Sequence, residues 1–186
     1  CKVVYLDFEL VPRLAKERIK EIINHPNNNY TPTKNYRYCG LRGQNRSLDE
    51  LALHIQNIKD FDPDLVIVDP FYKLGGEYDE NDAGSVSAVL NKMERFSERL
   101  GCAFVYAHHF SKGNKSEIDH IDRAAGSGVF ARDPDAILTL TPHEEEYHLV
   151  LEGTLRNFPT PDKQVVEFSW PNFIHKPDLD PNLRKP

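Results

Sequence analysis

The chain has 186 residues and carries 23 Lys and Arg against 29 Asp and Glu, a formal net charge of -6. A hydrophobic content of 39% and an aromatic content of 10% exclude an intrinsically disordered chain, because such chains lack the side chains for a core. The acidic total argues against a uniformly basic nucleic-acid surface but leaves room for a local basic channel. No apolar run approaches the roughly 18 to 20 residues of a membrane span, so we expect no membrane segment. Three widely spaced cysteines, an odd number, favour a reducing compartment and hence a cytoplasmic protein.

The first 107 residues alternate between strand and helix patterns. Apolar runs of β type cover residues 3–8, 36–39, 65–68 and 102–107. Apolar residues at helical spacing cover residues 11–23, 48–58 and 86–100, and residues 26–35 predict a loop. Ser47 and Glu50 form a capping box at the start of the second helix, and Gly101 ends the third. This alternation predicts an α/β fold, and the continuously apolar strands predict a parallel sheet that is covered on both faces.

The last third of the chain contains three further β-type runs. They cover residues 136–141, 148–156 and 164–170, and turn-rich segments separate them. We expect these runs to be antiparallel strands added to the parallel sheet. Residues 1–170 are therefore interpreted as one domain. Residues 171–186, which contain four of the 13 prolines, are interpreted as an extended C-terminal tail.

Polar side chains follow three of the predicted strands. Asp7 and Glu9 end the first, Asp69 ends the strand over residues 65–68, and His108 and His109 end the last of the parallel strands. In an open α/β sheet, ligands bind in the crevice outside the carboxyl ends of the strands, so these groups should converge. Each of them could instead cap a strand or anchor a loop through backbone N–H bonds. Because three strands end in this way, we favour a functional site.

Four apolar residues followed by Asp69 match the Walker B pattern. In that pattern the carboxylate at the strand end holds the magnesium ion that bridges the phosphates of a nucleotide. Glu9, on the neighbouring strand, could orient and deprotonate an attacking water, and His109 could sense the γ-phosphate through a hydrogen bond. Together these residues predict a site for phosphoryl transfer.

The stretch from residue 69 to residue 113 resembles the RecA-like ATPase core, most closely the RepA-type hexameric replicative helicases. Its motifs are the Walker B strand, the ENDAG turn at residues 80–84 and the HHFSKG element at residues 108–113. The resemblance covers about residues 1–157. It implies a three-layer sandwich in which a parallel sheet has helices on both faces and antiparallel strands at its C-terminal side.

The same resemblance implies an ATPase, possibly a DNA helicase, that uses ATP and Mg²⁺ in replication, recombination or mobile-element maintenance. In it, Asp69 would bind magnesium, Glu9 would activate water, and His109 would sense the γ-phosphate and relay its loss to a DNA-binding loop. Arg18, nine residues after Glu9, matches an arginine near the nucleotide.

The phosphate loop of this family, G-x-x-x-x-G-K-[ST], is absent from the sequence. We expect the chain to be a fragment that begins just after that loop. As given, it would lack the backbone N–H groups and the lysine that cradle the phosphates, and it should bind ATP weakly or not at all. A degenerate relative that does not hydrolyse ATP is the alternative.

The position of an arginine finger is also open, because Asp135 stands where the resembling helicase has an arginine. Such a finger reaches the site of a neighbouring subunit in a ring, so a homo-oligomer is expected. Arg132 and Arg156 are the two candidates at the nucleotide of the neighbour. Both could equally be surface arginines that pair with carboxylates.

Residues 110–123 form a long polar segment that could order on binding DNA, most readily a single strand. Lys112, Lys115 and Arg123 offer phosphate contacts. The carboxylates of Glu117, Asp119 and Asp122 offset them.

Two other classes of function remain. A metal-dependent phosphoesterase or nuclease would use two metal ions held by several carboxylate and imidazole ligands. Its candidate ligands are Asp7, Glu9, Asp69, His108, His109, Asp119, His120 and Asp122. A non-catalytic nucleotide-sensing or assembly module would keep the ATPase fold without turnover. A phosphate loop upstream of Cys1 would favour the enzyme over the module.

Overall fold

A computed structural model of the protein describes residues 1–28, 34–44, 46–51, 61–74, 79, 81–109 and 128–184. A four-stranded sheet with the strand order β2-β1-β3-β4 contains the first half of the chain, and all its neighbouring strands are parallel. Its strands are β1 (Val3–Asp7), β2 (Tyr36–Gly40), β3 (Leu65–Asp69) and β4 (Ala103–Tyr106). The predicted α/β fold with a parallel sheet is confirmed, and its architecture is that expected of a RecA-like domain.

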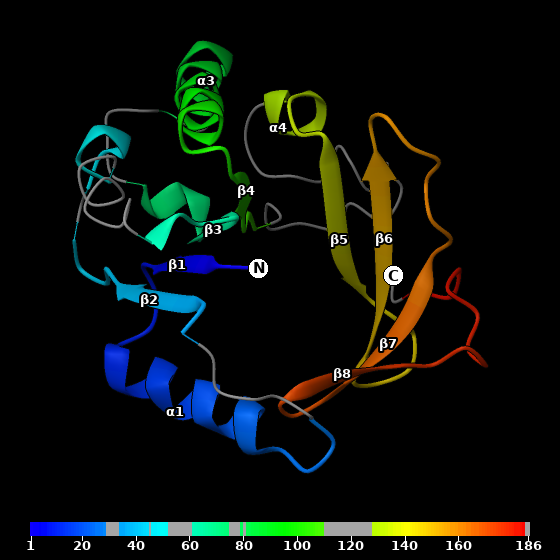
Figure 1. Ribbon diagram of the computed structural model, residues 1–186. Coiled ribbons are helices and arrows are strands. Elements are labelled where there is room, and N and C mark those ends of the chain that lie inside the picture. Colours follow the sequence, from blue (N-terminus) through cyan, green and yellow to red (C-terminus); the bar gives the residue numbers. More distant parts are fainter. Residues whose placement is uncertain are drawn as a thin grey trace.

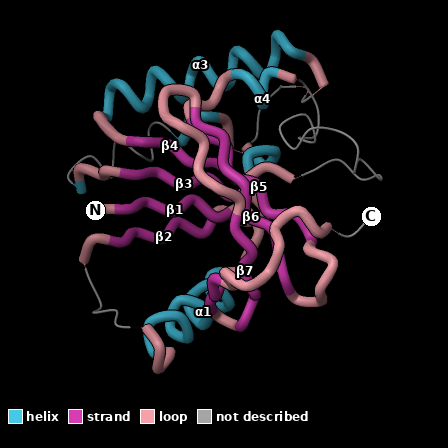
Figure 2. Tube along the Cα trace, turned by 90° about the vertical axis from the view of Figure 1, so that its right-hand side faces the viewer, coloured by secondary structure: helices cyan, strands magenta, loops and turns pink. Residues whose placement is uncertain are grey.

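Helices lie on opposite sides of these four strands, with α1 beyond β2 and α3 beyond β4 (Figures 1 and 2). Besides a helical turn at residues 48–51, the structure has α1 (Pro12–Asn24), the short 3-10 helix η2 (Phe71–Lys73), α3 (Ala83–Leu100) and α4 (Val129–Arg132). The side chain of Asp82 caps α3 by accepting a hydrogen bond from the Ser85 backbone N–H at 2.6 Å. Gly101 ends α3 in the left-handed conformation, with φ of 65°.

The predicted capping box also forms, because the Ser47 backbone N–H donates to Glu50 at 2.9 Å and the Glu50 N–H donates to Ser47 Oγ at 3.3 Å. Residues 48–51 are helical. The rest of that predicted helix lies outside the described residues.

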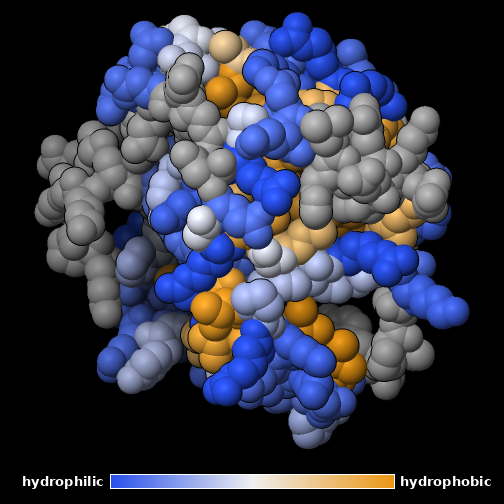
Figure 3. Space-filling model, turned by 90° about the vertical axis from the view of Figure 1, so that its left-hand side faces the viewer, coloured by the Kyte–Doolittle hydropathy of each residue, from blue (hydrophilic) through white to orange (hydrophobic). Residues whose placement is uncertain are grey.

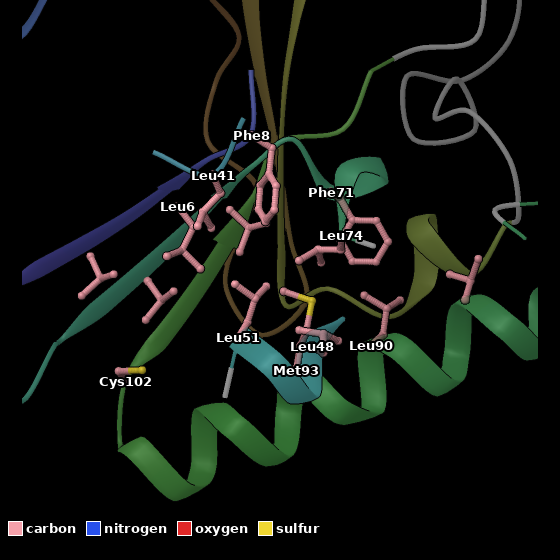
Figure 4. Close-up of a cluster of buried hydrophobic side chains, with 14 of the residues drawn as sticks. Leu6, Phe8, Leu41, Leu48, Leu51, Phe71, Leu74, Leu90, Met93 and Cys102 are labelled. Carbon is pink, nitrogen blue, oxygen red and sulfur yellow. The ribbon is translucent and has the colours of Figure 1, made fainter. Parts of the chain in front are cut away.

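The hydrophobic core lies between the sheet and α3. Alternate residues of β1 and β3 point toward the helix and are fully buried, namely Val4, Leu6, Val66 and Val68. In Figure 4, Leu90 and Met93 of α3 face Phe71, Leu74 and the side chains of the sheet. At about 25 cal/mol per Å² of buried apolar surface, this packing is the main source of stability for the sheet.

The opposite face of the sheet is less covered than the apolar strands predict. Leu65 and Ile67 are only partly buried, and Val105 is 50% exposed. The apolar strands β3 and β4 are therefore well packed on one face of the sheet, rather than on both faces as their sequences predict. Tyr5, Tyr36 and Tyr38 occupy this second face together with strand-end polar groups.

The three predicted C-terminal strands form a separate sheet together with a fourth strand that was not predicted, in the antiparallel order β5-β6-β7-β8. They do not extend the parallel sheet as expected, since no ladder joins the two sheets among the described strands. The strands are β5 (Ala136–Pro142), β6 (His148–Leu155), β7 (Gln164–Ser169) and β8 (Asn172–His175). β8 falls in the segment interpreted as a tail. Its Phe173 and Ile174 are 54% and 42% exposed, so no buried alternation marked it as a strand.

The end of the chain returns across the second sheet and is fixed to β6. Glu152, only 4% exposed, contacts the Lys163 ammonium at 2.7 Å and the Arg184 guanidinium at 2.5 Å. His143 is also buried, and its Nε2 lies 3.0 Å from the backbone oxygen of Asp180. These contacts hold residues 180–184 in place.

The face that lies on the left-hand side of Figure 1 is mostly hydrophilic, and hydrophobic areas are scattered over it, with larger ones in its lower part (Figure 3). Helix α1, which lies at the bottom of Figure 1, exposes Leu14 by 44% and Ile22 by 37%, and Val11 just before it is 37% exposed. Within the described part of the chain, none of the helices is both long enough and apolar enough to span a membrane.

Candidate functional site

The carboxyl ends of β1 and β3 bring two carboxylates side by side. Asp7 and Asp69 are paired in the parallel ladder, and side chains of paired residues point to the same face of a sheet. Glu9 follows two residues after Asp7, and the backbone N–H of Phe8 donates to the Asp69 carbonyl at 2.8 Å. The convergence that the sequence predicts for Asp7, Glu9 and Asp69 is therefore present in the structure.

Asp7 shapes the turn that carries Glu9. Its side chain is 1% exposed, and its Oδ1 accepts hydrogen bonds from the backbone N–H groups of Glu9 and Leu10, both at 2.8 Å. Its Oδ2 accepts a third hydrogen bond from the Tyr38 hydroxyl at 3.1 Å. Burial, followed by the nearby Asp7 charge, raises the pKa of Tyr38 to about 12, so the hydroxyl stays a donor at neutral pH. Asp7 therefore fits the alternative interpretation, in which a carboxylate at a strand end anchors a loop by accepting backbone N–H bonds.

Asp69 has a different environment from Asp7. The Tyr5 hydroxyl donates to Asp69 Oδ2 across neighbouring strands. Burial first, and then the hydrogen bond and charge of Asp69, raise the pKa of Tyr5 well above its ordinary value. Sequence reasoning did not single out Tyr5, because an aromatic residue in an apolar strand looks like any other packing residue.

Tyr72 of η2 contacts both Glu9 and His109. The Tyr72 hydroxyl donates to Glu9 Oε1 at 3.1 Å, and the Tyr72 ring centroid lies 5.9 Å from that of His109. All three side chains are exposed. The structure therefore brings together the predicted base and the predicted sensor, and it adds a tyrosine that the sequence analysis missed.

The two adjacent histidines have different surroundings. The His108 ring lies 4.3 Å from the ring of Phe130 and 6.3 Å from that of Phe71, inside an aromatic cluster. His109 is exposed on the side of Tyr72. Of the pair, His109 is the more exposed, and its role toward a ligand stays a prediction.

Arg18 lies on α1, and its guanidinium stacks over the Trp170 ring with 5.6 Å to the centroid. The Trp170 indole N–H also donates to Glu21 on the same helix, at 2.6 Å. These contacts join α1 to the turn between β7 and β8. Within the described residues, no contact links Arg18 to the strand-end carboxylates, and its place near a nucleotide stays a prediction.

The two candidate finger arginines differ in how they are held. Arg156 pairs with Asp135 at 3.3 Å and donates to the backbone oxygens of Arg132 and Asp133. Arg132 is exposed, and its guanidinium has no hydrogen-bond or ion-pair partner among the described residues. Arg156 thus binds carbonyl oxygens at the C-terminal end of α4. The role of either arginine as a finger stays a prediction.

The remaining predicted site residues lie outside the described part of the chain. They are the DNA-contact candidates Lys112, Lys115 and Arg123, together with Asp119, His120 and Asp122.

The chemistry of the strand-end groups fits magnesium. Mg²⁺ prefers oxygen ligands and is commonly held by one or two carboxylates together with substrate phosphates and waters. Asp69 offers such a carboxylate, already fixed by a hydrogen bond from Tyr5. A cluster of three or more His, Cys, Asp or Glu side chains suited to a metal ion is not found in the described ranges. Three candidate ligands of the two-metal phosphoesterase alternative, Asp119, His120 and Asp122, lie outside those ranges.

Comparison with known proteins agrees with this arrangement. A search of curated proteins gave no significant match. The family model described as AAA domain matches residues 1–115, a span that includes β1 to β4, Glu9, Asp69 and His109. Because the match covers more than half of the 186 residues, the chain belongs to the AAA domain family of nucleotide-binding ATPases.

Proposed function

We propose that the chain is the ATP-hydrolysing motor domain of a DNA-dependent ATPase of the RepA and RecA helicase type. The observation that carries the proposal is the convergence of Glu9, Asp69 and His109 at the carboxyl edge of the parallel sheet. Family membership supports nucleotide binding, and ligands of open α/β sheets bind at this edge.

Each of these residues has one chemical task in the proposal. Asp69 contributes an oxygen ligand to magnesium, which would neutralise phosphate charge when bound with the nucleotide. Glu9 accepts the proton of the attacking water on its carboxylate, which the turn at Asp7 holds beside the strand ends. His109 contacts the γ-phosphate and, through its ring contact with Tyr72, lies next to the residue that donates to Glu9.

The proposal also includes features that come from outside the described site. A phosphate-binding loop is required, and the 186 residues contain none. A neighbouring subunit in a ring would receive an arginine, for which Arg132 is the better candidate because Arg156 is already paired. Single-stranded DNA would bind the segment that contains Lys112, Lys115 and Arg123.

The first experiment is ATP hydrolysis by the full-length protein with and without single-stranded DNA. The Glu9→Gln variant should keep ATP binding and lose turnover by about 10²-fold, the scale of removing a general base. Glu17→Gln on α1 is the matched control, because Glu17 is an exposed glutamate that pairs with Arg13 at 3.5 Å, away from the strand ends. DNA-stimulated turnover that Glu9→Gln abolishes supports the motor domain. Turnover that survives this substitution contradicts the role of Glu9.

A non-catalytic nucleotide-sensing module is the second candidate, since membership of the AAA domain family is compatible with nucleotide binding without turnover. In that case the full-length protein binds ATP without hydrolysing it, with or without DNA. The same assay therefore separates the two functions.

A further inference from the structure

The carboxyl edge of the sheet contains two acidic side chains where one metal ligand is needed. Asp7 and Asp69 are direct neighbours in the parallel ladder and share one face. Like charges opposite one another on adjacent strands destabilise a sheet. Each carboxylate therefore needs donors of its own, and the way these donors are distributed separates the two acids.

Two stacked tyrosines supply the donors. Tyr5 of β1 and Tyr38 of β2 are paired in the ladder, and their rings stack with centroids 6.3 Å apart and planes 18° apart. The Tyr38 hydroxyl donates to Asp7, and the Tyr5 hydroxyl donates to Asp69. A tyrosine hydroxyl thus donates a hydrogen bond to each of the two neighbouring carboxylates.

The two acids differ in what remains of their hydrogen-bonding capacity. Asp7 is 1% exposed and accepts two backbone N–H groups besides the Tyr38 hydroxyl. Asp69 is only partly buried, and the Tyr5 hydroxyl is its one side-chain partner among the described residues. Asp7 is therefore committed to the turn, whereas Asp69 keeps an oxygen for a ligand.

We propose that Tyr5 is a positioning residue for magnesium binding, because its hydroxyl fixes one oxygen of Asp69 and leaves the other oxygen for the ion. This inference rests on the proposed function of the site. Partners that orient a metal ligand in this way are costly to remove: their loss typically weakens metal affinity by about 10- to 100-fold.

The test compares Tyr5→Phe with Tyr38→Phe in the full-length protein. Each substitution keeps the stacked ring and removes one hydroxyl that donates to a carboxylate, so the two should lower thermal stability comparably. Mn²⁺ serves as the probe, and its binding in the presence of ADP is measured by electron paramagnetic resonance. Tyr5→Phe should weaken Mn²⁺ affinity about tenfold or more. Tyr38→Phe should leave it within about twofold, since Asp7 is not the ligand.

A double-mutant cycle with Asp69→Asn separates positioning from general destabilisation. If Tyr5 acts through Asp69, Tyr5→Phe should cause no further loss of Mn²⁺ affinity once Asp69 is replaced. Independent losses in the double variant, equal losses for the two tyrosine variants, or unchanged affinity for Tyr5→Phe would each overturn the inference. In those cases a loss on Asp69→Asn alone would still uphold the proposed function. Failure of the unsubstituted protein to bind Mn²⁺ with ADP would overturn both.

Discussion

Replacing Asp7 tests whether a buried carboxylate holds the turn that presents Glu9. Asp7→Ala leaves three donors without their acceptor: the backbone N–H groups of Glu9 and Leu10 and the Tyr38 hydroxyl. At about 1 kcal/mol for each lost hydrogen bond, the free energy of unfolding should fall by about 3 kcal/mol. For a domain of this size, that loss corresponds to a decrease in Tm of about 6 to 12 °C.

Asp7→Asn should cost less, about 1 kcal/mol, because the amide oxygen can still accept from both backbone N–H groups. The neutral amide also removes the repulsion between Asp7 and Asp69. The Tyr38 hydroxyl can then rotate to accept from the amide nitrogen.

Urea unfolding followed by circular dichroism measures these differences, with Asp162→Ala as a control at an exposed aspartate in a loop. The unfolding slope should stay constant, so that the midpoint reports stability alone. If Asp7→Ala costs no more than Asp162→Ala, or if Asp7→Asn costs as much as Asp7→Ala, the hydrogen bonds at Asp7 do not hold the turn.

Three further predictions concern stability. Glu152→Gln should lower the free energy of unfolding by about 2 kcal/mol, less than for a fully buried pair, because the ammonium of Lys163 and the guanidinium of Arg184 can reach water once they lose their partner. Trypsin should then cleave faster after Arg184, and an unchanged cleavage rate would contradict this. Gly101→Ala should cost about 1 kcal/mol in urea unfolding through backbone strain alone, since a Cβ there would meet nothing within 4 Å; no loss would refute the strain argument. Burial raises the pKa of Tyr36 and of Tyr38 from 10.0 to about 12, so the folded state retains their protons in that range. Their contribution to the urea midpoint should therefore be constant below pH 10 and be lost between pH 10 and 12. For each tyrosine, substitution by Phe should reduce the fall of the midpoint over that range, and an undiminished fall in both variants would point to other groups.

Much of the parallel half of the fold follows from local sequence signals. The capping box at Ser47 and the end of α3 at Gly101 are confirmed because each depends on residues only a few positions apart. The apolar runs also locate β1, β3 and β4. What they do not reveal is that only one face of β3 and β4 is well covered, since coverage depends on what packs there and not on the strand itself.

β8 was missed for a related reason. Its residues pair with β7 through backbone hydrogen bonds, while Phe173 and Ile174 remain largely exposed. A strand that buries little shows no alternating pattern, and the prolines around it favoured a tail.

The acids of the candidate site were predictable, but their hydroxyl partners were not. Asp7, Glu9 and Asp69 stand at strand ends, a position that can be read from the sequence. The pairs of Tyr38 with Asp7 and of Tyr5 with Asp69 depend on the strand order β2-β1-β3 and on its register. Neither the order nor the register is a local property of the sequence.

The open edges of the two sheets have a practical consequence for handling this polypeptide. Among the described strands, β4 is hydrogen-bonded only to β3, and β5 is hydrogen-bonded only to β6. Both expose branched aliphatic side chains at these edges, with Val105 50% and Leu138 71% exposed. An unpaired edge of this kind is a template for strands of other molecules. Light scattering of the 186-residue polypeptide at several dilutions ought therefore to precede any interpretation of its oligomeric state.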